Sequence, residues 1–235
     1  MSKYLYDSDY SSDSLRWIKL KENNVDYSEE YLDKLQSLII STNDSALAYF
    51  FAFDFKYKTY KMQKIIIENK DPKYAFLFAQ NINNCDIAAM QKIVLDSNKV
   101  KYICKFICYI KNANIDLLED RVIKSKNVKY AHMIIKNVKG TDINKFKTII
   151  FNSKKPRYLF ELSKHITNKK ELSRIENLII ESKSFTYIRL FAEKNKNANI
   201  EKLEKVILDS GNLNEIKKFA KYVKRSKMKQ FLLVS

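Results

Sequence analysis

The sequence predicts an all-α fold, an α-solenoid of seven antiparallel two-helix repeats of about 28 residues with an N-terminal cap. Tyrosines recur every 28 residues, with one final step of 29, at Tyr74, Tyr102, Tyr130, Tyr158 and Tyr187. The 235 residues include only two glycines and two prolines, too few for the turns of a sandwich, a barrel or a Rossmann sheet. An apolar content of 46%, with 14 Phe and 15 Tyr, supplies a large core.

The text around these tyrosines repeats as well. Four clear copies begin at Met62, Met90, Leu118 and Phe146. Three degenerate copies begin at Leu35, Ile175 and Leu203. In a stacked array of this kind, one unit buries its apolar face only when neighbouring units cover it. The copies therefore predict one elongated array.

Each copy contains two runs of apolar residues with helical spacing. In the third copy, steps of three and four residues run from Ile87 to Val94 and again from Tyr102 to Ile110. These runs predict two short helices per copy, here called helix A and helix B. Residues suited to cap helix A precede it at Asp86, Asn114, Asp142 and Asn199. Both connections are short, so the two helices are predicted to be antiparallel neighbours.

Three residue types recur at fixed places in the copies. A serine stands between the helices, at Ser97, Ser125, Ser153, Ser182 and Ser210. We expect its hydroxyl to satisfy backbone groups at the helix ends. The tyrosine opens helix B, which predicts an amphipathic core residue; the alternative is a platform on which nucleic-acid bases stack. Phe78, Phe106 and Phe191 of helix B are predicted to be buried.

Three segments are predicted along the chain. Residues 1–30 form an acidic leader, rich in Tyr and Ser, and a capping helix; residues 31–228 form the repeat array; residues 229–235 form a truncated C-terminal capping helix. The residues that could cover the first repeat are Leu15, Trp17, Ile18 and Leu20. The last segment matches the start of an eighth helix A and then stops. We therefore expect the C-terminal apolar edge to be thinly capped or covered by another chain, with self-association as one form of this.

The basic residues are in phase with the repeat. The chain has 44 basic and 27 acidic residues, a net charge of +17, and the excess lies after residue 60. Basic side chains recur one position before, six after and nine after the tyrosine, offsets that fall on roughly one side of helix B. The predicted binding surface is Lys73, Lys101, Lys129, Arg157, Lys136, Lys164, Lys221, Lys111, Lys139, Lys196 and Lys224.

Two partners suit such a surface. The first interpretation is a non-enzymatic scaffold that binds a protein with an acidic surface. The alternative is sequence-independent binding of nucleic acid through its phosphates. Lysines outnumber arginines by 38 to 6, and arginine is the better residue for paired contacts, so the composition favours an acidic protein or a merely solvated face. The acidic leader, with Asp7, Asp9 and Asp13, is a candidate to fold back and compete for this surface.

No catalytic, cofactor or metal motif is predicted. His132 and His165 fall at different repeat positions and belong to no metal-binding motif. Cys85, Cys104 and Cys108 have no ligand partners at metal spacing, so we interpret them as buried reduced thiols.

The carboxylates do not suggest a catalytic pair either. One position of helix A is occupied by Gln91, Glu119, Lys147, Glu176 and Glu204. Because this position mixes charges, we interpret it as a surface row. We therefore predict no enzyme and no cofactor, and the one enzymatic alternative is a glycosylase on a HEAT-like scaffold.

The expected location is the cytoplasm, without membrane contact. No apolar run approaches the roughly 18 residues of a membrane span. The start of the chain has neither the basic leader nor the apolar core of a signal peptide.

The repeat text resembles a family. The patterns NIEKLEKVILDS from Asn199 and KYAFLFA from Lys73 are similar to uncharacterised two-helix α-solenoid repeat proteins of bacteriophages and large DNA viruses. The resemblance covers nearly the whole array and is one of repeat style. It implies a build related to HEAT and tetratricopeptide arrays and a role in binding a host factor, and it transfers no functional residue.

Overall fold

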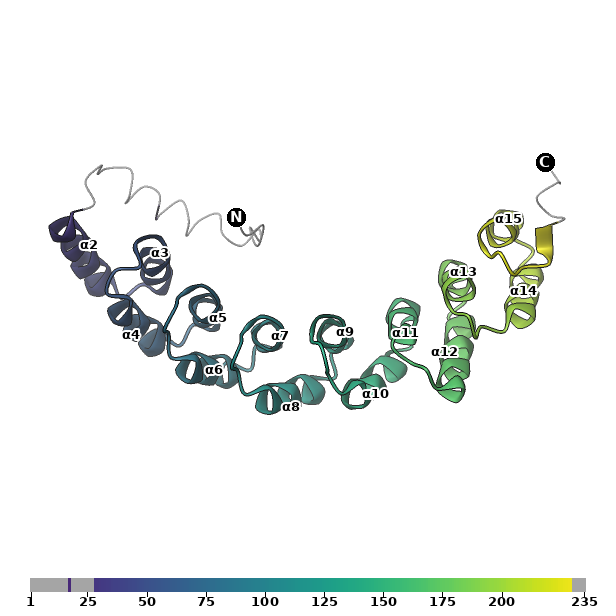
Figure 1. The fold of residues 1–235 in the computed structure, drawn as a ribbon, viewed down its shortest axis with the longest axis horizontal. Coiled ribbons are helices and arrows are strands. Elements are labelled where there is room, and N and C mark those ends of the chain that lie inside the picture. The colour runs from purple at the N-terminus through teal and green to yellow at the C-terminus, as the bar shows by residue number, and fades with distance from the viewer. Residues whose placement is uncertain (1–16, 18–27, 230–235) are drawn as a thin grey trace. The chain divides into compact units, whose positions relative to one another are not determined.

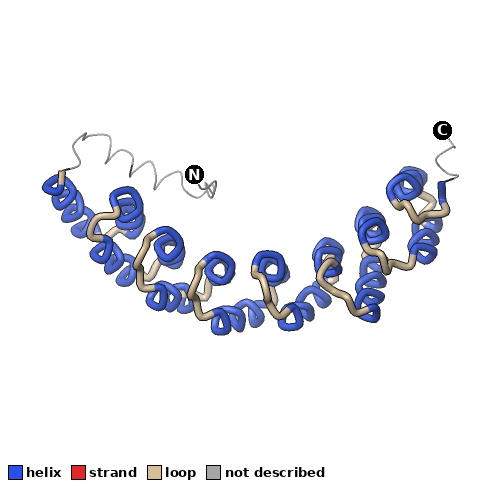
Figure 2. Tube along the Cα trace, viewed as in Figure 1, coloured by secondary structure: helices blue, strands red, loops and turns tan. Residues whose placement is uncertain are grey.

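The chain folds into consecutive pairs of short helices. The computed structural model describes residue 17 and residues 28–229. That part of the chain contains 14 helices and no strand, which confirms the all-α fold. Short turns join the helices into seven successive pairs, numbered here as repeats 1 to 7 (Figure 1, Figure 2).

Each repeat consists of one helix A followed by one helix B. Helix A is, in order, α2 (Glu29–Thr42), α4 (Thr59–Asn69), α6 (Ile87–Asp96), α8 (Ile115–Ser125), α10 (Ile143–Ser153), α12 (Lys169–Glu181) and α14 (Ile200–Asp209). Helix B is α3 (Ser45–Phe55), α5 (Pro72–Asn81), α7 (Val100–Tyr109), α9 (Val128–Asn137), α11 (Pro156–Ser163), α13 (Phe185–Lys194) and α15 (Leu213–Tyr222). The repeat register read from the tyrosines is therefore confirmed.

The described residues fall into two compact units. The boundary lies between Val122 and Ile123, inside α8. In the first unit α3 packs on α5 and α5 on α7; in the second, α9 packs on α11, α11 on α13 and α13 on α15. Within each unit the B helices thus form one row, and the A helices form another beside it (Figure 1).

Helix starts follow from the capping residues. Asp86, Asp142 and Asn199 each accept a backbone N–H of the helix A that follows, at 2.9 to 3.1 Å, as predicted. Pro72 and Pro156 open α5 and α11, where the missing amide proton costs nothing.

The turn between helix A and helix B, called the A–B turn below, has the same backbone in every repeat. Each contains one residue with a left-handed backbone, φ between +48° and +64°: Asn43, Lys70, Asn98, Lys126, Lys154, Lys183 and Gly211. The serine before it closes the turn. Ser153 Oγ donates to the Ile150 carbonyl at 2.7 Å and accepts the N–H of Lys155 at 3.3 Å. The other serines accept the equivalent N–H, which confirms their predicted structural role.

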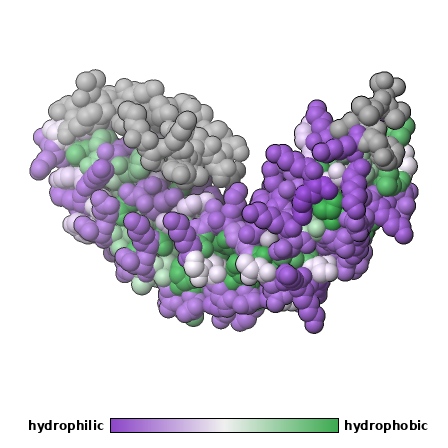
Figure 3. Space-filling view, turned by 45° about the vertical axis from the view of Figure 1, so that its right-hand side comes forward, coloured by the Kyte–Doolittle hydropathy of each residue, from purple (hydrophilic) through white to green (hydrophobic). Residues whose placement is uncertain are grey.

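The core lies between the two rows of helices. One position of helix B, which stands four after the tyrosine in repeats 2 to 6, is occupied by Phe51, Phe78, Phe106, Ile134, Leu162, Phe191 and Phe219, and none of these side chains is more than 1% exposed. The predicted burial of Phe78, Phe106 and Phe191 is therefore confirmed. Outside this core, hydrophilic residues dominate the face shown in Figure 3.

Trp17 covers part of the first repeat. Its side chain is buried, its ring lies against Phe50 and Phe55, and its Nε1 donates to Asp54 Oδ2 at 2.8 Å. This agrees with the predicted cap at that residue. The rest of the predicted leader up to residue 27, and residues 230–235 of the predicted C-terminal cap, lie outside the described residues.

Candidate functional site

A basic residue precedes four of the five recurring tyrosines and lies in the first turn of helix B. Its cation stands over the ring of the tyrosine that follows, at 4.9 Å for Lys73 and Tyr74, 5.6 Å for Lys101 and Tyr102, 6.0 Å for Lys129 and Tyr130, and 6.0 Å for Arg157 and Tyr158. A cation–π contact of this kind orients the charge without neutralising it.

The tyrosine rings themselves belong to the packing between repeats. Tyr74 is buried, and the other four are half-buried. The ring of Tyr158 also lies 5.2 Å from that of His132, on the preceding helix B, and Tyr187 lies 6.1 Å from Phe160 in the same way. This burial agrees with the amphipathic interpretation.

The structure divides the predicted binding surface between two ends of helix B. The residues nine after the tyrosine, Lys111, Lys139, Lys196 and Lys224, lie beyond helix B, in the turn toward the next helix A. Lys136 and Lys221 lie in the last turn of their helices, and Lys164 follows α11 directly. Since ten residues of helix span about 15 Å, these cations are far from those in the first turn. The basic residues one before the tyrosine are therefore separated along the axis of helix B from those six and nine after it.

A group of cations in the second unit lies on two adjacent A–B turns. Repeats 4 and 5 place five exposed basic residues there, called the basic turn cluster: Lys126, Lys129, Lys154, Lys155 and Arg157. No acidic residue occurs in residues 124–130 or 152–158. Within the described residues none of the five makes an ion pair. By contrast, Lys218 pairs with Glu215 at 2.8 Å and Lys227 with Glu201 at 2.8 Å in the same unit.

His132 reports on the surroundings of this cluster. Burial lowers the pKa of its imidazole below the ordinary value; Glu161 opposes this change, and Lys136, Arg157 and His165 add to it. Burial is thus the main cause of the lowered pKa, and the charged neighbours act on it in both directions.

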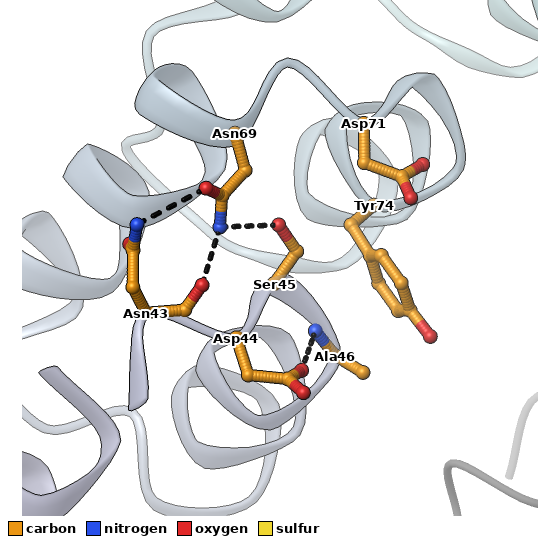
Figure 4. A pocket seen from close by; sticks show the side chains of 7 residues that line it. All are labelled: Asn43, Asp44, Ser45, Ala46, Asn69, Asp71 and Tyr74. Atoms are coloured by element: carbon orange, nitrogen blue, oxygen red, sulfur yellow. Dashed lines mark hydrogen bonds between the residues drawn. The ribbon is translucent and has the colours of Figure 1, made fainter. Parts of the chain in front are cut away.

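The same turns in repeats 1 and 2 are chemically different. An open hollow of about 530 Å³ lies between them, lined by Asn43, Asp44, Ser45, Ala46, Asn69, Asp71 and Tyr74. Figure 4 shows the two asparagine side chains joined at 3.2 Å, with the aspartates beside them. Asp44 and Asp71 each accept backbone N–H groups at the start of their helix B. This hollow has carboxylates and amides on its walls, and no basic residue lines it.

One row of polar residues that the sequence analysis assigned to the surface is buried. Gln91, Glu119, Glu176 and Glu204 are 4 to 8% exposed, and Lys147 is half-buried. Each of these side chains that has a described partner reaches the segment that begins the next repeat. Gln91 Oε1 accepts the N–H of Asn114 at 2.8 Å, and its Nε2 donates to the carbonyl of the same residue at 3.2 Å. The surface-row interpretation is therefore wrong.

The equivalent residues make the same contact in other repeats. Gln63 accepts the N–H of Asp86 at 2.9 Å, Glu176 that of Asn199 at 2.9 Å, and Glu204 that of Lys227 at 2.6 Å. The partner is always 23 residues further along. Lys147 forms an ion pair with Glu171 instead. We call this set the inter-repeat clamp, because it joins a helix A to the segment that follows the next helix B.

Two of the three cysteines have raised pKa values, whereas the hydrogen bond with Cys104 lowers the pKa of Cys108. Burial raises the pKa of Cys85 to about 11, and the Cys108 thiol together with burial holds the pKa of Cys104 above its usual range. Thiols with raised pKa values are poor nucleophiles at neutral pH. All three are free cysteines; Cys104 is buried as predicted, whereas Cys85 and Cys108 are half-buried.

The described residues contain neither a metal site nor a membrane-spanning helix. In residue 17 and residues 28–229, no group of three or more His, Cys, Asp or Glu side chains is arranged to hold a metal ion. No helix in that part is long and apolar enough to cross a membrane. In comparisons with known proteins, no family model, no curated protein and no solved structure matches this chain.

Proposed function

We propose that the chain is a non-enzymatic repeat scaffold that holds an acidic segment of a protein partner on its A–B turns, with the basic turn cluster as the main contact. The observation that supports this proposal is the independence of the cations from the fold. Repeat 1 builds the same turn with Asn43 and Asp44, and repeat 7 builds it with Gly211 and Asn212. The turn therefore does not require the lysines of repeats 4 and 5.

The basic residues of this cluster also occupy positions that are unfavourable for the stability of the fold. A left-handed backbone costs a side-chain-bearing residue about 1 kcal/mol relative to glycine, yet Lys126 and Lys154 adopt it. Lys129 and Arg157 stand in the first turn of a helix, where the helix dipole repels a cation by about 0.3–1 kcal/mol. Five neighbouring cations without ion pairs repel each other as well. A partner that brings carboxylates would remove this repulsion.

The proposal extends to the setting. Reduced cysteines are typical of the cytoplasm, and we place the protein there. The similarity of its repeat text to phage and viral repeat proteins supports a host factor as the partner. Both statements belong to the proposal.

A comparison of two variants with equal charge tests it. One variant changes Lys126, Lys129, Lys154 and Arg157 to Gln. The control changes Lys111, Lys139, Lys196 and Lys224 to Gln, which removes the same charge from the other end of helix B. The affinity for a labelled ten-residue glutamate peptide is measured by fluorescence anisotropy. We expect the first variant to bind at least about tenfold more weakly and the control less than about threefold. Equal losses would refute the assignment to the A–B turns.

Nucleic acid is the second candidate function, because consecutive turns repeat their cations at even steps, as a phosphate backbone repeats its charges. If about six cations met phosphates, affinity should fall roughly a thousandfold between 50 and 200 mM salt. The measurement is a gel-shift titration with single- and double-stranded oligonucleotides. No shift at 50 mM salt with either would remove this candidate.

A further inference from the structure

We infer that the second unit recognises a two-part peptide segment: an acidic stretch on the basic turn cluster and, some six residues away, an apolar side chain on the A–B turn of repeat 7. This inference rests on the proposed function and adds the second contact. Its first support is that the A–B turns of the second unit change from basic to apolar between repeat 5 and repeat 7.

Cations disappear from the A–B turns toward the C-terminal end. Residues 153–157 of repeat 5 include three basic residues. The equivalent residues of repeat 6 include Lys183 alone, and residues 210–214 of repeat 7 include none. The charge that would attract an acidic segment is therefore concentrated two turns before the end.

Apolar surface appears where the charge ends. The first residue of helix B is apolar in repeats 4 to 7, namely Val128, Pro156, Phe185 and Leu213. The first three are half-buried, whereas Leu213 is 68% exposed. Leu208, across the same turn, is 39% exposed. A side chain of a bound peptide could cover both leucines and remove this apolar area from water.

The spacing fixes the length of the ligand. Adjacent packed helices lie about 8–10 Å apart, so the turns of repeats 5 and 7 are roughly 16–20 Å apart. An extended peptide advances about 3.3 Å per residue, so five to six residues bridge the two contacts.

Two other occupants fit less well. Nucleic acid offers Leu213 and Leu208 only base rings, sugar carbons and the thymine methyl group, and no large aliphatic side chain. A second copy related by two-fold symmetry would place the same edge opposite itself, and the two basic turn clusters would then repel each other. A peptide with an acidic stretch and an apolar side chain can contact both the basic turn cluster and the two leucines of repeat 7.

The test uses three synthetic peptides. Two join four glutamates, a six-residue glycine-serine spacer and a leucine-phenylalanine pair, in the two possible orders; the third lacks the apolar pair. We expect one order to bind the wild type about tenfold more tightly than the third peptide, the effect of burying one large apolar side chain. Leu213→Ser should abolish this gain and leave binding of the third peptide unchanged. Leu117→Ser, a change at a leucine 54% exposed in the first unit, should preserve the gain.

Several outcomes would overturn the inference. The first two are equal binding of all three peptides and a gain in affinity that survives Leu213→Ser. The third is a wild-type dimer that Leu213→Ser converts to a monomer in light scattering. The fourth is displacement of the tighter peptide by a twenty-nucleotide thymidine strand, when Leu213→Ser does not change the affinity for that strand. If no glutamate peptide binds at all, the proposed function fails as well. If the third peptide binds and the apolar pair adds nothing, only the present inference fails.

Discussion

The A–B turns of repeats 1 and 7 and those of repeats 4 and 5 share one backbone and differ in charge. Asn43, Lys126, Lys154 and Gly211 all have φ between +48° and +64°. Repeats 1 and 7 have no cation at the left-handed residue, at the residue after it, or at the second residue of helix B, which are the positions of Lys or Arg in repeats 4 and 5. The difference teaches that the turn is specified by its hydrogen bonds and by the core beneath it, whereas its charge is free to vary and can serve recognition.

The largest effect is expected from a substitution in the hydrophobic core that the repeats share. Phe106 is fully buried in α7. Phe106→Ala should lower the free energy of unfolding by about 3–5 kcal/mol, because it leaves a cavity in the hydrophobic core between the helices. Chemical denaturation measures the change. The control Leu117→Ala, at an exposed leucine, should cost less than about 1 kcal/mol. A value for Phe106→Ala within about 0.5 kcal/mol of wild type would show that the repeat register is wrong.

The inter-repeat clamp should matter next. Gln91→Leu leaves the N–H and the carbonyl of Asn114 without their side-chain partner, so we expect a loss of about 1–3 kcal/mol. Lys92→Ala, at the exposed neighbour, is the matched control and should change little. Denaturation of both variants in parallel provides the measurement. Equal, small effects would mean that the clamp does not join the repeats energetically.

The same position offers a pH test. Burial raises the pKa of Glu176 above its ordinary value of 4.5, although the N–H of Asn199 and the charge of Lys202 oppose this. The folded state then holds the proton more tightly than the unfolded state, so stability from this group is present below pH 4.5 and is lost as the pH rises through the folded-state value.

Glu176→Gln should therefore be more stable than wild type at pH 7, and this gain should vanish as the pH falls below about 4.5. Gln91 shows how an amide satisfies both atoms at this position. Thermal unfolding across a pH series measures the difference. Glu201→Gln is the control: the Lys227 hydrogen bond lowers the pKa of this exposed carboxylate, so its change should give no gain at pH 7. A gain independent of pH would contradict the assignment to ionisation.

The smallest effect on stability is expected for the charge itself. The double variant Lys126→Asn and Lys154→Asn should unfold within about 0.5 kcal/mol of wild type, because asparagine tolerates a left-handed backbone and both side chains are exposed. The reverse change, Gly211→Lys, should cost about 1 kcal/mol from the backbone alone, since a Cβ there meets no atom within 4 Å. A large loss in the double variant would mean that the lysines build the turn after all.

Much of the fold could be predicted because its signals are local and periodic. The steps between apolar residues give two helices per copy, and Asp86, Asp142 and Asn199 mark helix starts through bonds that span only two or three residues. Burial of Phe106 followed from its place on the apolar stripe. The charge of the A–B turns is also explicit in the sequence, so Lys129 and Arg157 were named as candidates from their phase alone.

The sequence by itself thus determined the number of repeats, the register, the turn chemistry and the presence of basic rows. Tertiary structure decided which rows lie together and which polar residues are buried. The row nine after the tyrosine lies outside helix B because the helix ends before Lys111 and Lys139, a boundary set by the turn and not by the offset in sequence. Glu176 and Glu204 are buried because their partners are backbone N–H groups 23 residues away, and every residue has such a group. Side-chain patterns cannot reveal a partner that no side chain provides; only the packing of one repeat on the next brings it within hydrogen-bonding distance.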